Sequence, residues 1–146
     1  MTLVAKFVKA PAHRRRLYVE STLLLVLIRL GIHVLPLRPV RWMASAAASL
    51  LRTVLPRPAA TDVREVSSAV AAASRVVPHA TCLVRALAVQ ALCETRQCAA
   101  TLCVGVRRGS GGTLEAHAWV EPADQRFADG AHGGYHTLAT FDRVRP

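Results

Sequence analysis

Long apolar runs and aromatic side chains are scarce in this chain of 146 residues. The run from Leu23 to Ile28 is far shorter than the roughly 20 apolar residues that a membrane-spanning helix needs, and Arg29 closes it. No signal-peptide cleavage site follows this run, so we expect a cytoplasmic protein. In that compartment the four cysteines are expected to be reduced thiols rather than a disulfide framework.

Acidic residues are nearly missing from the first part of the sequence. Residues 1 to 60 hold ten Lys and Arg against one acid, Glu20, whereas residues 61 to 146 hold nine Arg against eight acids. The segment Pro56-Arg57-Pro58 lies where this balance changes. We therefore predict a basic helical N-terminal extension over residues 1–60 and a catalytic domain over residues 61–146.

A basic extension on a nearly neutral domain indicates an acidic partner, such as a peptide, a protein face or an anionic membrane surface. Nucleic acid is not expected, because the arginines are not interleaved with aromatic residues and no helix-turn-helix is recognisable. Peripheral contact with a membrane stays open, since Arg14 to Arg16 adjoin an apolar helix.

The hydrophobic pattern predicts helices followed by a small antiparallel sheet, which is an α+β fold. The expected helices cover residues 17–30, 40–55, 61 to shortly before 78, and 82–92. The expected strands cover residues 99–106, 114–121 and 126–129 as a meander, and a Gly-rich loop follows over residues 130–136. The nucleophile helix over 82–92 is expected to pack on the sheet.

Cys82 is the candidate nucleophile. Thr81 has the side chain of an N-cap, which places Cys82 in the first turn of a helix, where the macrodipole and free backbone N–H groups favour a thiolate. The other cysteines are placed differently: Cys93 near the C-terminus of that helix, Cys98 in the connection to a strand, and Cys103 inside an apolar strand.

His117 is the candidate general base. Strand alternation over residues 115–121 puts Glu115, His117 and Trp119 on one face and the small apolar residues on the other. If the residues around Pro122 form a hairpin loop, Asp129 lies opposite His117, where its carboxylate can fix the imidazole tautomer. Asp124 is the rival carboxylate, although it is expected to face solvent in the turn.

These motifs together resemble the lasso-peptide leader peptidases of the bacterial transglutaminase-like superfamily. The resemblance rests on the run from Cys82 to Ala88, the run from Ala116 to Glu121, and Asp129-Gly130, and it covers roughly residues 60 to 140. It implies a transglutaminase/papain-like core in which Cys82, His117 and Asp129 form a catalytic triad and no cofactor is needed.

The resemblance also implies a substrate and partners. Enzymes of this family cut a ribosomally made precursor at the junction of leader and core, and an asparagine-synthetase-like cyclase then closes the ring. A RiPP recognition element protein presents the leader, and we expect it to be a separate chain here. The backbone N–H of Cys82 is the natural oxyanion donor, and Trp119 or His79 is considered as the second. Trp119 is also a candidate substrate-binding residue.

Three alternatives remain open from the sequence. The first is a zinc module that uses Cys93, Cys98, His132 and His136, although neither pair lies on one rigid element. The second is a non-catalytic basic adaptor that binds a membrane or a partner through residues 1–60. The third is transglutaminase-type amide transfer, in which an amine replaces water at the same three residues.

Overall fold

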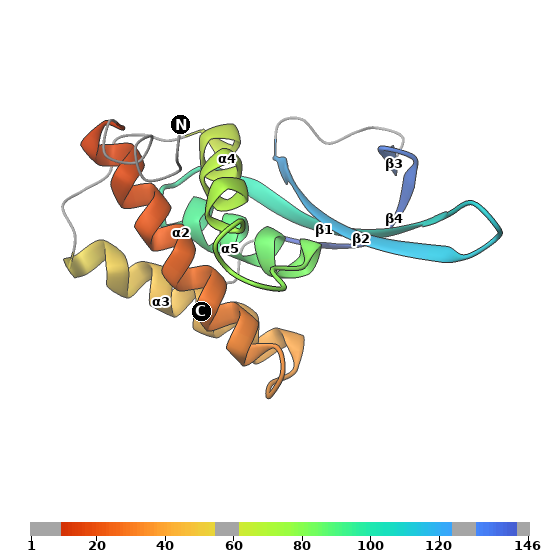
Figure 1. Cartoon of the computed structure of the whole chain (residues 1–146), viewed down its shortest axis with the longest axis horizontal. Coiled ribbons are helices and arrows are strands. Elements are labelled where there is room, and N and C mark those ends of the chain that lie inside the picture. The colour runs from red at the N-terminus through yellow and green to blue at the C-terminus, as the bar shows by residue number, and fades with distance from the viewer. Residues whose placement is uncertain (1–9, 55–61, 124–130, 143–146) are drawn as a thin grey trace.

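The computed structural model describes residues 10–54, 62–123 and 131–142, with the helices on one side and the sheet on the other (Figure 1). The helices are α2 (Ala12–Gly31), α3 (Leu37–Val54), α4 (Val63–Ala73) and α5 (Cys82–Thr95). The strands are β1 (Ala100–Arg108), β2 (Leu114–Pro122), β3 (Ala131–His132) and β4 (Tyr135–Phe141). The expected α+β class is confirmed, with a helical N-terminal part ahead of an antiparallel sheet.

The central element is α5. It contacts α2, α3, α4, β1 and β2, and ten of its 14 residues are buried. Its sequence explains this position, because apolar residues occur on all its sides, as is typical of a helix that is surrounded by protein. The residue at its first position is therefore held firmly relative to the sheet.

The first two helices contribute to the same hydrophobic core as α5. In α2, Leu24 and Ile28 are at most 1% exposed, and α3 buries every fourth residue through Val40, Ala44 and Ala48. All five belong to one core cluster with residues of α4, α5 and β1. The domain boundary predicted near residue 60 lies outside the described residues, and the core draws on both sides of it.

The helix ends follow local chemistry closely. We expected the second helix to begin at Val40, and it begins at Leu37, because Pro39 falls in the first turn, where a helix has no use for the missing N–H. Helix α2 follows directly after Pro11. Within the described ranges, no helix combines the length and the apolar character needed to cross a bilayer.

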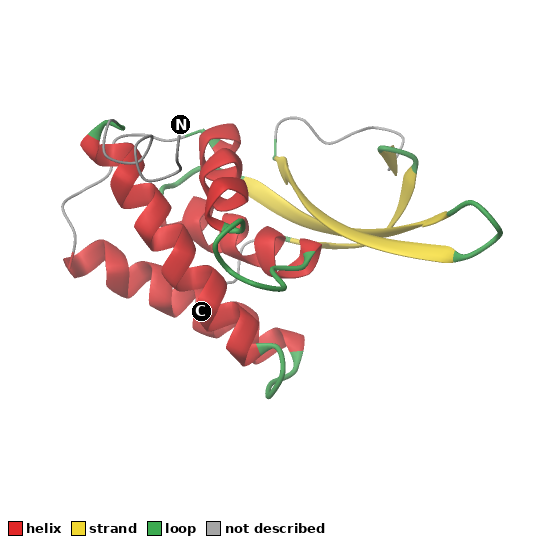
Figure 2. Ribbon diagram, viewed as in Figure 1, coloured by secondary structure: helices red, strands yellow, loops and turns green. Residues whose placement is uncertain are grey.

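The sheet has the strand order β2-β1-β4-β3, and every pair is antiparallel (Figure 2). Ala118 of β2 belongs to the core with the helices. The alternate residues His117 and Trp119 therefore lie on the opposite face, together with Gly105, which pairs with His117 across the β1–β2 ladder. The predicted alternation in this strand is confirmed.

The first two strands of the predicted meander are present and pair antiparallel, whereas the loop predicted over 130–136 is wrong in its described part. The segment expected to be a Gly-rich loop over 130–136 contains β3, a tight turn and the first residues of β4. Gly133 and Gly134 both have positive φ, which permits this turn. The glycine pair that was predicted to lie in a loop therefore forms the turn of a hairpin. In the sheet, β4 lies beside β1. The strand predicted over 126–129 lies outside the described residues.

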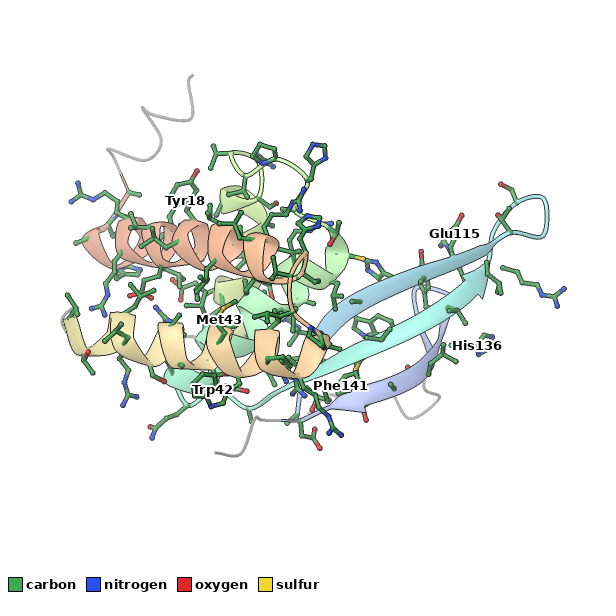
Figure 3. All side chains as sticks on the ribbon, turned by 90° about the horizontal axis from the view of Figure 1, so that it is seen from below. Tyr18, Trp42, Met43, Glu115, His136 and Phe141 are labelled. Atoms are coloured by element: carbon green, nitrogen blue, oxygen red, sulfur yellow. The ribbon has the colours of Figure 1, made fainter. Side chains whose placement is uncertain are left out.

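Strand β4 is tied to the helices at its C-terminal end. The buried amide of Gln90 in α5 donates to the carbonyl oxygen of Phe141 at 2.7 Å. The Phe141 ring lies beside α3 (Figure 3), where the guanidinium of Arg41 stacks over it at 5.0 Å. These contacts fix β4, and through it the whole sheet, against the helical layer.

Candidate active site

Cys82 is the first residue of α5, as the sequence predicted. Thr81 has extended backbone angles and its side-chain oxygen accepts a hydrogen bond from the N–H of Val84 at 3.4 Å, so it is the N-cap. The half-buried thiol of Cys82 therefore lies beside backbone N–H groups that have no partner within the helix. N–H groups in this position can donate to an oxyanion that forms beside the sulfur.

Cys82 and His117 line the same cavity. This cavity has a volume of about 220 Å³ and lies between α4, α5 and β2. Its apolar walls come from α4 and α5, and Trp119 also lines it. The fold thus joins the predicted nucleophile and the predicted base, although 34 positions separate them in the sequence.

His117 lies on β2, an edge strand of the described sheet, so it lines this cavity and also belongs to an aromatic group with Trp119 and Tyr135. Its ring stacks on Trp119, with centroids 6.0 Å apart and planes at 15°, and lies 5.0 Å from the ring of Tyr135. The guanidinium of Arg107 lies 4.5 Å from the centre of the Tyr135 ring and pairs with Glu115 at 2.8 Å. The imidazole is therefore packed against two aromatic rings, which limits its rotation.

Gly105 makes the contact between His117 and Tyr135 possible. The two residues lie on β2 and β4, with β1 between them. A Cβ atom at Gly105 would lie 2.8 Å from Cη2 of Trp119 and 2.5 Å from the carbonyl oxygen of His136. Because this position has no side chain, the rings close over β1.

Tyr135 was not predicted from the sequence to lie near His117. The available signal was the glycine inside an otherwise regular strand, since such a residue often marks a close approach by another group. The chain has only two tyrosines, so each was a candidate for a specific structural or functional role. What the sequence lacked was the pairing of β4 with β1, and without it no pattern connects Tyr135 to His117.

Trp119 is not placed as an oxyanion donor. Its indole N–H donates to Glu121 at 2.7 Å, and the ring is 7% exposed. His79 has a positive φ of 57° and an exposed side chain, and it is not among the residues that line the cavity. Neither residue presents a second donor in this conformation. Trp119 lines the cavity, which is consistent with its predicted contact with the substrate.

The two predicted carboxylates, Asp129 and Asp124, lie outside the described residues. The role of Asp129 as the third member of a triad therefore stays a prediction. The zinc alternative gains no support, because the described residues contain no group of three or more potential metal ligands. Cys93 and Cys98 lie together at the end of α5, far along the helix from Cys82.

One comparison with known proteins found a match, and it covers the part of the chain that forms this site. A search of curated proteins and a search of solved structures each found no match. A family model described as "Transglutaminase-like superfamily" matches residues 24–141, which include α3, α4, α5 and the sheet. Enzymes of that superfamily usually work through a cysteine, and Cys82 is the cysteine that starts the central helix. The chain belongs to the transglutaminase-like superfamily.

Proposed function

We propose that this protein is a cysteine peptidase that removes the leader from a ribosomally synthesised lasso precursor peptide in the cytoplasm. The observation that carries the proposal is the shared cavity of Cys82, at the start of a buried helix, and His117, on an aromatic-packed strand. A thiol and an imidazole in one small cavity are the minimum for nucleophilic acyl transfer. The resemblance of the motifs to leader peptidases supplies the substrate class.

The reaction runs in two halves. His117 takes the proton from Cys82, and the thiolate forms a bond to the scissile carbonyl carbon. Protonated His117 then gives its proton to the leaving amine of the core peptide as the C–N bond breaks. In the second half, His117 activates a water that displaces the thiolate from the thioester, which releases the leader as a carboxylic acid.

The cavity explains why partners are part of the proposal. At about 220 Å³ it holds only the residues next to the scissile bond. Most of the affinity for one precursor must therefore come from contacts elsewhere on the leader. A separate RiPP recognition element protein that carries the leader would supply them, and an asparagine-synthetase-like cyclase would use the released core peptide.

Substitution of the nucleophile tests the proposal. Cys82→Ala should abolish leader release, measured by mass spectrometry of the precursor, while its circular dichroism spectrum stays unchanged. Cys93→Ala, Cys98→Ala and Cys103→Ala are matched controls, and each should retain activity, with some loss of stability where the thiol is buried. Full activity in Cys82→Ala would refute the assignment.

The base and the predicted carboxylate are tested in the same assay. His117→Ala should be as damaging as Cys82→Ala, because the members of such a group act as a unit. Asp129→Asn should cost less, since it disturbs orientation and leaves the base in place. If Asp124→Asn is inactive and Asp129→Asn has normal activity, then Asp124 is the carboxylate that orients His117.

The same assay separates hydrolysis from amide transfer. With a primary amine present, a transferase would give a leader that ends in a substituted amide, whereas a peptidase gives the free acid. The masses of these two products differ, so one measurement decides between water and an amine as the acceptor.

A further inference from the structure

The C-terminal end of α5 brings two cysteines together. The N–H of Cys98 donates to the carbonyl oxygen of Cys93 at 3.1 Å, a bond that spans six residues. Gln97 precedes Cys98 and has a φ of +58°. This combination is a Schellman motif, in which the side chains at its two ends come into contact. Standard bond lengths then place the two Cα atoms no more than about 7 Å apart.

The Cys98 thiol lies against Cys93. It donates a hydrogen bond to the carbonyl oxygen of Cys93 at 3.5 Å. Cys93 is 0% exposed, whereas Cys98 is half-buried, so reagents in solution reach Cys98 first. Both remain unlinked in this structure.

The surroundings make the two thiols chemically unequal. The neighbouring Cys93 side chain lowers the pKa of Cys98, and the nearby positive charge of Arg96 acts in the same direction. The neighbouring Cys98 side chain raises the pKa of Cys93, and burial adds to the increase. Cys98 therefore has more thiolate character and better access, which are the properties of the thiol that meets an oxidant first.

We propose that Cys93 and Cys98 form a redox-active dithiol that peroxide converts into an intramolecular disulfide. The site is separate from the cavity of Cys82 and does not depend on the proposed peptidase function. Metal binding is the weaker use of this pair, since a structural zinc needs four ligands and the described residues supply no third.

The chemistry balances in two steps with hydrogen peroxide as the oxidant. The Cys98 thiolate attacks one peroxide oxygen, so that an S–O bond forms, the O–O bond breaks and hydroxide leaves. Cys93 then attacks the sulfur of the Cys98 sulfenic acid, so that the S–S bond forms and water leaves. Because the turn already holds the two Cα atoms within about 7 Å, the second step needs only small side-chain movements.

The test uses the full chain with Cys82→Ala, so that the candidate nucleophile does not react. The protein is exposed to hydrogen peroxide, unfolded, and treated with N-ethylmaleimide. Intact mass should show the loss of two hydrogens, and peptide mapping should show Cys93 linked to Cys98 with Cys103 alkylated. Three alkylated cysteines, or a disulfide that includes Cys103, would overturn the proposal.

A second variant distinguishes the roles of the two thiols. In Cys82→Ala with Cys93→Ser, Cys98 has no partner to resolve it, so peroxide should leave a sulfenic acid that dimedone traps. Dimedone should not label the parent protein, because Cys93 closes the disulfide first. Equal labelling in both proteins would show that Cys93 does not resolve Cys98, and would refute the dithiol.

Discussion

At the scale of single residues, the contact between Tyr135 and His117 was not predicted from the sequence. The Tyr135 ring packs on His117 from two strands away, and it does not line the cavity of Cys82. A packed aromatic pair contributes about 1 kcal/mol. Tyr135→Leu should therefore lower kcat by up to about tenfold through a less ordered imidazole, with KM unchanged.

The control for this prediction is Tyr135→Phe, which keeps the ring and loses only the hydroxyl. It should retain the wild-type kcat and the wild-type pH profile. If both variants lose activity equally, the ring packing is not the cause. A parallel rise in KM would point instead to direct contact between Tyr135 and the substrate.

Cys82 and His117 were predictable because each is defined by local pattern. An N-cap type of residue before a helical run identified Cys82, and strand alternation placed His117. Tyr135 was not predictable, because its contact requires knowing that β4 pairs with β1 and that Gly105 leaves space. The register proposed for Asp129 depends on residues outside the described ranges, so it stays a prediction.

At the scale of elements, the start of α5 is held by one side chain. Thr81 caps the helix that begins with Cys82. Thr81→Ala should cost about 1 kcal/mol in the free energy of unfolding, measured by urea denaturation. It should also slow the alkylation of Cys82 by iodoacetamide, because a frayed first turn no longer presents its N–H groups to the sulfur. Thr81→Ser keeps the cap and should preserve both values.

The other end of α5 is anchored to α2 by a buried ion pair. Glu20 accepts hydrogen bonds from Arg16 at 2.7 Å and from Arg96, and the side chains of Glu20 and Arg96 are each 3% exposed. Removing one partner of a buried pair leaves an uncompensated charge. Glu20→Ala should therefore cost about 3 kcal/mol or more in the free energy of unfolding.

The matched control is an exposed pair that involves the same helix. His13 lies 3.5 Å from Glu65, with side-chain exposures of 57% and 34%. Glu65→Ala should cost less than about 1 kcal/mol, because solvent screens such a pair. Similar losses in the two variants would mean that the Glu20 pair is not specifically stabilising.

The helices were predicted better than the sheet. The apolar periodicity and the caps of a helix are visible in consecutive residues, so the ends of most helices were predicted to within a few residues. The sheet required long-range pairing, because its strand order depends on β4 pairing with β1. The turn at Gly133-Gly134, which joins β3 to β4, was identified from composition only as a loop. Local sequence patterns identify individual helices and strands, but they do not show which strands pair with each other.

At the scale of the whole molecule, the excess of positive charge is concentrated in the first 60 residues. On α2, Arg14 and Arg15 are exposed. Arg16 is different, because it is largely buried and pairs with Glu20. A surface test should therefore change Arg14 and Arg15 and leave Arg16 in place.

Arg14→Glu with Arg15→Glu should weaken binding of the leader or of the recognition protein, measured by calorimetric titration. The loss should be larger at low salt than at physiological salt, since exposed charges are screened. The alkylation rate of Cys82 should not change. Arg108→Glu, on the exposed hairpin, is the control. Unchanged partner binding together with lost attachment to anionic vesicles would assign this surface to a membrane.

The stacking of His117 on Trp119 also gives the protein an optical signal. The chain has two tryptophans. Trp42 is 63% exposed on α3, whereas Trp119 lines the cavity of Cys82 and His117. Trp42→Phe leaves Trp119 as the single tryptophan, and its ring contacts the proposed base. Protonated imidazole quenches indole emission, so the fluorescence of this variant should fall as His117 gains its proton. Loss of the pH-dependent quenching in Trp42→Phe with His117→Ala would verify the source, and binding of a peptide in the cavity could then be followed without any label.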